Sequence, residues 1–216
     1  MTASDYLQII AFVAFFTVLT PVMGRYMYLV FTGKKHALLP VFGWAERLVY
    51  RFAGVTPARE SNWKSYTFNL LLFNLAGFVF LFLIQVFQES LPLNPAGLQN
   101  VSWHSAFNTA VSFVTNTNWQ GYAGETTLSH LVQMVGLTVQ NFVSAATGIA
   151  VIVAFARAVS RKNTDRIGNF WIDLTRGTLY ILLPLSMVFA MVLAGQGVVQ
   201  NLSAGETVQT LQGSSQ

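Results

Sequence analysis

Cysteine is absent from this chain of 216 residues, and only 9% of the residues are charged. Without a thiolate, neither a disulfide framework nor a cysteine-based metal site can form. Soluble domains are about a quarter charged, so a chain that is 53% hydrophobic and this poor in charge is expected in a lipid bilayer. The composition therefore predicts an integral membrane protein.

Charge is missing altogether from four long stretches of the chain. Residues 6–24, 65–88, 126–156 and 177–205 contain no lysine, arginine, aspartate or glutamate. Each stretch is close to or longer than the roughly 20 residues that a spanning helix needs. The first eight residues also lack a basic side chain, so we expect the first stretch to remain as a span and not to be a cleaved signal peptide. We predict an all-α integral membrane protein with four spans.

The basic residues lie between the predicted spans and set their orientation. They fall between the first and second spans and between the third and fourth, whereas the N-terminus, residues 89–125 and the tail after residue 200 have none. The positive-inside rule places the two basic loops in the cytoplasm and the N-terminus outside it. The net charge of +4 thus reflects membrane topology and does not indicate binding to nucleic acid.

The first basic loop contains an amphipathic pattern. Apolar residues recur at spacings of three and four from Leu38 to Phe52, opposite Glu46, Arg47 and Arg51. This pattern predicts a short helix on the inner membrane surface, where arginines suit anionic headgroups. A docking helix for a cytoplasmic partner is the alternative.

The segment from Trp103 to Tyr122, WHSAFNTAVSFVTNTNWQGY, is too short and too polar to cross a bilayer, yet it lies between two predicted spans. A helix from Trp103 to Thr115 would be about 20 Å long, against a hydrocarbon core of about 30 Å. The polar run after it is tolerated at membrane depth only where protein encloses it or where it lines a water-filled path. We predict a re-entrant half-helix that enters from outside and ends in a polar turn.

That polar turn is the predicted ion site. The C-terminal end of a helix carries a partial negative charge, and potassium filters replace the hydration shell of the ion with backbone carbonyls. Glycine and asparagine tolerate the positive φ that such a turn requires. An ordinary polar extracellular loop is the alternative reading. The candidate filter residues are Thr115, Asn116, Thr117, Asn118, Gln120 and Gly121.

Other chemistry is not indicated by the sequence. Glu125, just past the turn, either concentrates cations at the outer mouth or is a simple acid at a helix N-terminus. His104 and His130 have no carboxylate or cysteine at ligand spacing, so no transition-metal site is expected. No nucleophile–base pattern or phosphate-binding glycine loop is present, so we expect a non-catalytic chain without an organic cofactor.

Two sequence runs carry a resemblance to a known family. Residues 114–125 (VTNTNWQGYAGE) and 131–151 (LVQMVGLTVQNFVSAATGIAV) strongly resemble the potassium-binding A subunit of the bacterial Kdp potassium-transporting ATPase, and residues 166–186 fit the same family. Members are potassium-channel-like transporters in which four membrane-pore-membrane repeats form one filter. The resemblance implies that the candidate filter residues are one repeat's share of a potassium filter.

The resemblance also implies a domain organisation. Residues 1–32 would be an extra transmembrane helix, 33–64 a cytoplasmic loop with the interfacial helix, 65–156 the first membrane-pore-membrane repeat, 157–176 a second cytoplasmic loop, and 177–216 the first span of an incomplete second repeat. Family members are considerably longer, so the chain is expected to be an N-terminal portion of such a subunit, which needs the remaining pore repeats.

The same resemblance implies partners and a location. A separate P-type ATPase subunit would hydrolyse ATP, small accessory subunits would complete the complex, and the complex would lie in the bacterial inner membrane, where potassium is the transported ion. Two alternatives stay open: a self-assembling cation channel in which several copies each contribute one turn, and a non-transporting membrane scaffold whose polar turn binds a partner.

Overall fold

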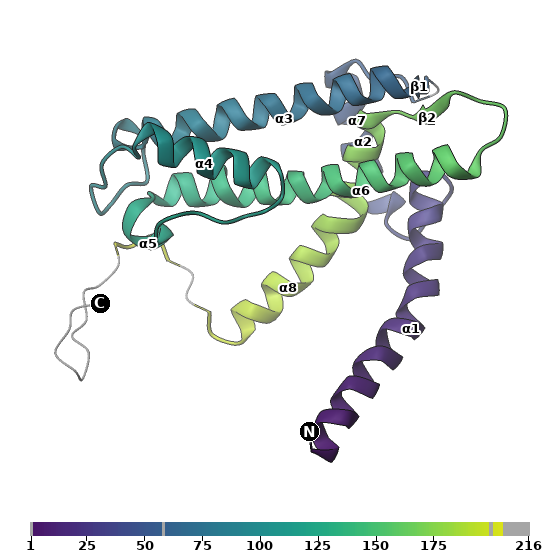
Figure 1. Ribbon diagram of the computed structural model, residues 1–216, viewed down its shortest axis with the longest axis horizontal. Coiled ribbons are helices and arrows are strands. Elements are labelled where there is room, and N and C mark those ends of the chain that lie inside the picture. Colours follow the sequence, from purple (N-terminus) through teal and green to yellow (C-terminus); the bar gives the residue numbers. More distant parts are fainter. Residues whose placement is uncertain (1, 58, 199–200, 205–216) are drawn as a thin grey trace.

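The computed structural model describes residues 2–57, 59–198 and 201–204. The structure is built almost entirely from helices (Figure 1). The helices are α1 (Ala3–Phe31), α2 (Leu39–Ala53), α3 (Trp63–Val86), α4 (Trp103–Val114), α5 (Gly124–Thr127), α6 (Val139–Ser160), α7 (Phe170–Arg176) and α8 (Leu183–Gly195). A 3₁₀ turn (Gln88–Ser90) follows α3, and π-helical segments (Val132–Thr138 and Gly177–Leu182) lead into α6 and α8. The short strands β1 (Ser61–Asn62) and β2 (Arg166–Gly168) pair antiparallel.

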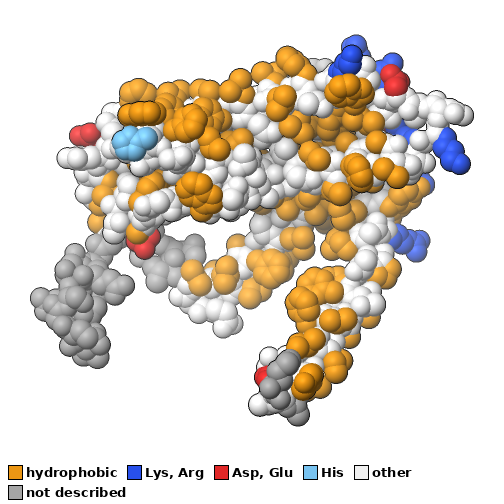
Figure 2. All heavy atoms as spheres, in the orientation of Figure 1, with side chains coloured by type: hydrophobic (Ala, Val, Ile, Leu, Met, Phe, Trp, Pro, Cys, Tyr) orange, Lys and Arg blue, Asp and Glu red, His pale blue; other side chains and the backbone are white. Residues whose placement is uncertain are grey.

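Four helices are long and apolar enough to cross a membrane: Ser4–Phe31, Trp63–Val86, Val132–Ser160 and Phe170–Gly195. Their faces carry many exposed apolar side chains, and in Figure 2 hydrophobic atoms cover the long helices while many of the lysine and arginine atoms gather near the β1–β2 end. A surface of this kind is stable in lipid but not in water. The predicted all-α membrane fold with four spans is confirmed.

The spans α3 and α6 run side by side with α4 packed against them, whereas α1 and α8 extend away from this group (Figure 1). One core cluster, which includes Leu81, Ala106 and Val132, joins the C-terminal half of α3, α4 and the first part of the third span. A second, which includes Tyr66, Ala150 and Phe170, joins the other ends of α3 and α6 to α7. The small side chains of Ala146, Ala150 and Ala154 allow close helix approach on this face of α6.

Two spans have different boundaries from the charge-free runs. The third begins at Val132, after the short α5 helix, and the run from residue 126 is therefore not one helix. The fourth begins at Phe170, within the segment that the sequence assigned to a cytoplasmic loop. Asp173 and Arg176 lie inside this span because each has a partner of opposite charge.

The predicted amphipathic helix corresponds to α2. Pro40 occupies its first turn, and Gly54 ends it in the left-handed conformation at φ 64°. Glu46 and Tyr50 are buried against the rest of the molecule, while the apolar Trp44 and Phe52 are exposed. The side of α2 that binds the protein is thus partly polar, which the sequence pattern alone did not indicate.

Candidate ion-binding site

The half-helix predicted from Trp103 is present as α4, which has 12 residues and so is about 18 Å long. Its buried residues, among them Ala106, Ala110 and Phe113, pack with Leu81 and Ile84 of α3. A helix of this length cannot span the hydrocarbon core. It can therefore enter the hydrocarbon core but cannot cross it.

The turn after α4 lies at the middle of the third span. Ser144 Oγ donates a hydrogen bond of 3.2 Å to Asn116 Oδ1. At 1.5 Å per residue, Ser144 is about 18 Å from the start of that span and about 24 Å from its end. Figure 1 shows the chain turning back from α4 toward α5. The predicted dip is confirmed, and the alternative of an ordinary external loop does not fit this contact.

The turn has an alternating backbone. Asn116 and Asn118 each have φ 60°, and the intervening Thr117 does not share this conformation. Asparagine is several-fold enriched among non-glycine residues with positive φ. Gly121 was expected to contribute in the same way, but its φ is not in the left-handed region. The expected positive φ is therefore absent at Gly121, whereas its assignment to the filter stays a prediction.

The carbonyl oxygens of the turn are left free, while its amide groups from Thr115 to Trp119 are bonded. Thr117 N donates to Ser112 O at 2.9 Å, and Trp119 N donates to Ser112 Oγ at 2.8 Å. The carbonyls from Thr115 to Gln120 accept no hydrogen bond from the residues that the structure describes. Because free carbonyls at membrane depth are costly unless an ion or water engages them, they form a candidate ion site.

The polar side chains mainly brace the turn. Thr115 Oγ1 donates to Val111 O at 2.9 Å and also lies 2.9 Å from Thr117 Oγ1. Asn118 Nδ2 donates to Asn116 Oδ1 at 3.2 Å. Asn118 Oδ1 is buried and has no hydrogen-bond partner in the described part of the chain. This orphaned oxygen is a further candidate ligand beside the carbonyls.

The last predicted site residues lie at the C-terminal end of the turn and in α5. The Gln120 side chain is half-buried beside Gly124. Glu125 is exposed in the first turn of α5. Among the described residues, no group of three histidine, aspartate or glutamate side chains is placed to hold a metal ion. The site thus offers neutral oxygens and the negative end of α4, a combination that suits a dehydrated monovalent cation.

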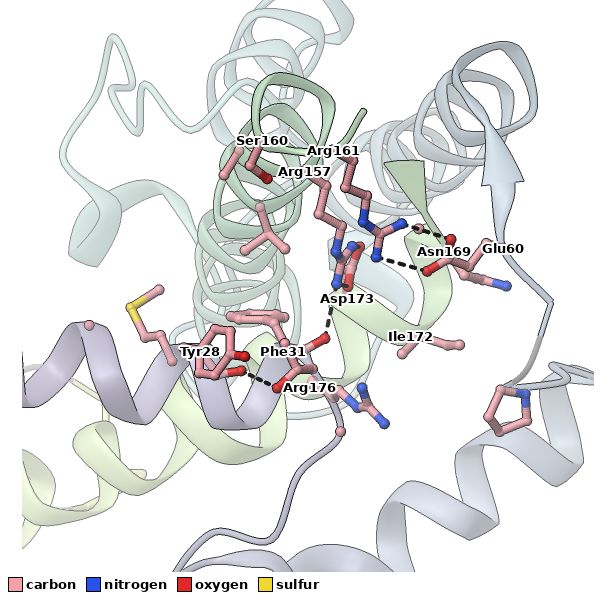
Figure 3. A pocket seen from close by; sticks show the side chains of 18 residues that line it. Tyr28, Phe31, Glu60, Arg157, Ser160, Arg161, Asn169, Ile172, Asp173 and Arg176 are labelled. Carbon is pink, nitrogen blue, oxygen red and sulfur yellow. Dashed lines mark hydrogen bonds and ion pairs between the residues drawn. The ribbon is translucent and has the colours of Figure 1, made fainter. Parts of the chain in front are cut away.

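Two buried charge clusters lie away from the turn, and the sequence analysis missed both. In the first, Arg157 on α6 donates to both carboxylate oxygens of Asp173 on α7 at 2.6 and 2.8 Å (Figure 3). The Tyr66 hydroxyl lies 3.1 Å from the same carboxylate, and Arg157 also donates to Phe31 O. This cluster holds the starts of α3 and α7 to the end of α6.

The second cluster joins α2 to the fourth span. Glu46 accepts hydrogen bonds from Arg176 Nε at 2.8 Å, from Tyr50 at 2.7 Å and from Tyr180 at 2.6 Å. Burial alone would raise the pKa of Glu46, but the three donors and the Arg176 charge hold it below its ordinary value. The carboxylate therefore stays ionised and fixes α2 to the bundle.

A cavity of about 630 Å³ lies between α1, α6 and α7 (Figure 3). Its charged lining residues are paired within the chain, since Arg161 binds both oxygens of Glu60 at 2.8 and 3.0 Å and Arg157 binds Asp173. Hydrogen bonding to Arg161 lowers the pKa of Glu60. The cavity thus has little net charge with which to attract an ion.

Comparison with known proteins places the chain in a family. The family model described as potassium-transporting ATPase A subunit matches residues 10–216. The chain belongs to this family. Among its curated relatives are proteins named potassium-transporting ATPase potassium-binding subunit from Pseudomonas aeruginosa, 54% identical over all 216 residues, and from Rhodospirillum centenum, 55% identical over the same length.

A third relative, from Nitratidesulfovibrio vulgaris, has the same name; it is 49% identical over 217 residues and also covers the whole chain. The chain spans 38% of the length of each of these relatives. The family assignment agrees with the resemblance seen in the sequence, because the matched region includes the half-helix, the turn and the third span.

Proposed function

We propose that this chain binds potassium as part of the potassium-binding subunit of an ATP-driven uptake pump. The observation that carries the proposal is the row of free carbonyl oxygens from Thr115 to Gln120, set at the end of a half-helix beside the middle of a span. The relatives' names supply the ion, because each is called a potassium-binding subunit. Potassium would enter from the outer face and exchange its water shell for these oxygens.

The proposal assigns ATP hydrolysis to a partner chain. The sequence has no phosphate-binding glycine loop, and the relatives are named as subunits of an ATPase. A P-type ATPase subunit with small accessory membrane subunits would complete the pump. A self-assembling channel and a scaffold protein are not favoured, because the family is one of ATPase subunits.

We further propose that α3, α4 and the third span form one membrane-pore-membrane repeat, with α1 as an additional helix and the fourth span as the start of a second repeat. The remaining filter segments would come from other repeats of the longer subunit. The basic loops support an inner-membrane location with the N-terminus outside the cytoplasm. The exposed apolar face of α2 and its arginines support its place on the inner leaflet.

The test is potassium uptake by the host under potassium limitation, with variants introduced at the native gene and other potassium uptake systems deleted. Asn118→Val places a β-branched residue at φ 60°, where it is a steric outlier, and we expect it to abolish growth at limiting potassium. Asn163→Val is the matched control, because Asn163 has φ 58° in an exposed loop away from the turn.

Immunoblots of membranes establish that both variants accumulate equally. Lost uptake in Asn118→Val with normal uptake in Asn163→Val supports the filter assignment. Equal uptake by the two variants and the parent contradicts potassium binding at the turn. The scaffold interpretation would then be favoured. Uptake that persists after ATP depletion points instead to a channel.

A further inference from the structure

Tyr122 directly follows the turn, and its hydroxyl is engaged on two sides. It donates to Gln85 Oε1 on α3 at 3.0 Å and lies 3.0 Å from Thr109 Oγ1 on α4. A phenol has a single proton, so Thr109 must be the donor in the second bond. One side chain thus ties the outer end of the turn to both helices that flank it.

The acceptor of this bond is fixed in orientation. Gln85 is fully buried, and its Nε2 donates to Leu81 O at 2.8 Å and to Ala106 O at 3.4 Å. These two bonds leave Oε1 facing Tyr122. Thr109 is also buried, so the hydroxyl of Tyr122 is held by groups that have almost no access to water. A buried network whose members are all satisfied is rigid.

The rest of the turn is attached by other contacts. At the inner end of the turn, Asn116 is bonded to Ser144, and in the middle of the turn Trp119 N is bonded to Ser112 Oγ. At the outer end of the turn, the Tyr122 hydroxyl is bonded to Gln85. The backbone amides of Gln120, Gly121 and Tyr122 donate no hydrogen bond to the described part of the chain. The hydroxyl of Tyr122 is therefore the hydrogen-bonded attachment of this stretch.

We propose that Tyr122 is a positioning residue that sets the spacing of the carbonyl oxygens from Thr117 to Gln120, with Gln85 and Thr109 holding its hydroxyl. This inference rests on the proposed function. Discrimination between potassium and sodium depends on where the coordinating oxygens lie and on how strongly their dipoles act. A turn released at its outer end would bind potassium more weakly and accept sodium more readily.

The test measures rubidium and potassium uptake by host cells that carry each variant at the native gene, with and without competing sodium. Thr109→Val loses one hydrogen bond and should raise the half-saturating potassium concentration about three- to tenfold. Tyr122→Phe loses two and should raise it at least as much. Both should also increase inhibition by sodium while the maximal rate is retained. Thr109→Ser keeps the hydroxyl and should behave like the parent.

Tyr28→Phe is the matched control. Among the described residues, this exposed phenol, near the C-terminal end of α1, bonds to Lys34 alone, so its loss should leave ion preference unchanged. Normal half-saturation and normal sodium inhibition in Tyr122→Phe and Thr109→Val overturn the inference. Failure of both variants to accumulate in membranes also overturns it, because the network would then be purely structural. If Asn118→Val abolishes uptake in the same assay, the proposed function stands even then. If Asn118→Val is silent, the function itself fails.

Discussion

At the scale of single residues, Asn116 combines two tasks that are usually separate. Its left-handed φ of 60° turns the backbone, and its side chain accepts hydrogen bonds from Ser144 and Asn118. Glycine would keep only the first task, because it adopts positive φ without a steric cost. A β-branched residue would keep neither.

This distinction gives a prediction for Asn116. We expect Asn116→Gly to retain measurable potassium uptake and Asn116→Val to lose at least about tenfold more, since the left-handed region costs about 1–2 kcal/mol for a residue with a Cβ and more for a branched one. Initial uptake rates at equal membrane abundance check the order. Equal loss in both variants would contradict the prediction, because uptake would then depend on the Asn116 amide and not on its backbone conformation.

At the scale of elements, α2 is attached to the fourth span through Glu46 and Arg176, whose side chains are only 9% and 17% exposed. Removing one partner of a buried pair leaves an uncompensated charge and costs about 3–5 kcal/mol. We expect Glu46→Gln to lower the melting temperature of the purified protein by more than Glu60→Gln does. Glu60→Gln is the control, because the Glu60–Arg161 pair is 41% and 37% exposed and such pairs contribute about 1 kcal/mol or less.

The same pair has a defined pH dependence. The folded pKa of Glu46 is held below its ordinary value of 4.5, so its stabilisation is present above that value and is lost as the pH falls through the lower folded pKa. The difference in melting temperature between the parent and Glu46→Gln should thus be constant from roughly pH 8 to roughly pH 6 and shrink only in acid. A difference that already disappears near neutral pH would contradict this.

The elements also show what a sequence can predict. The half-helix α4 was predictable because its length and the polarity of TNTNWQG are local properties. The start of the fourth span was not, because Asp173 and Arg176 are tolerated only through Arg157 and Glu46, and Glu46 lies 130 residues from Arg176. The spacing of Asp173 and Arg176 between apolar residues was the available signal. The brace at Tyr122 likewise depends on contacts across 37 residues.

At the scale of the whole molecule, the distribution of charge predicts which ends of the helices face the cytoplasm. The absence of cysteine makes the chain suited to single-cysteine labelling. In intact cells, a membrane-impermeant maleimide should label Asn100→Cys, beyond the outer end of α3, and should not label Asn163→Cys, in the exposed loop between α6 and β2. Permeabilisation should expose the second site. The reverse pattern would invert the topology and direct the turn to the cytoplasmic side.

In the proposed function, the oxygens from Thr115 to Gln120 replace the water around a potassium ion. The most direct measurement is anomalous diffraction from crystals of the assembled complex, prepared with rubidium in place of potassium. We predict a rubidium peak facing the carbonyl oxygens of this turn. A map in which rubidium occupies other sites at saturating concentration and leaves these oxygens without a peak would contradict it.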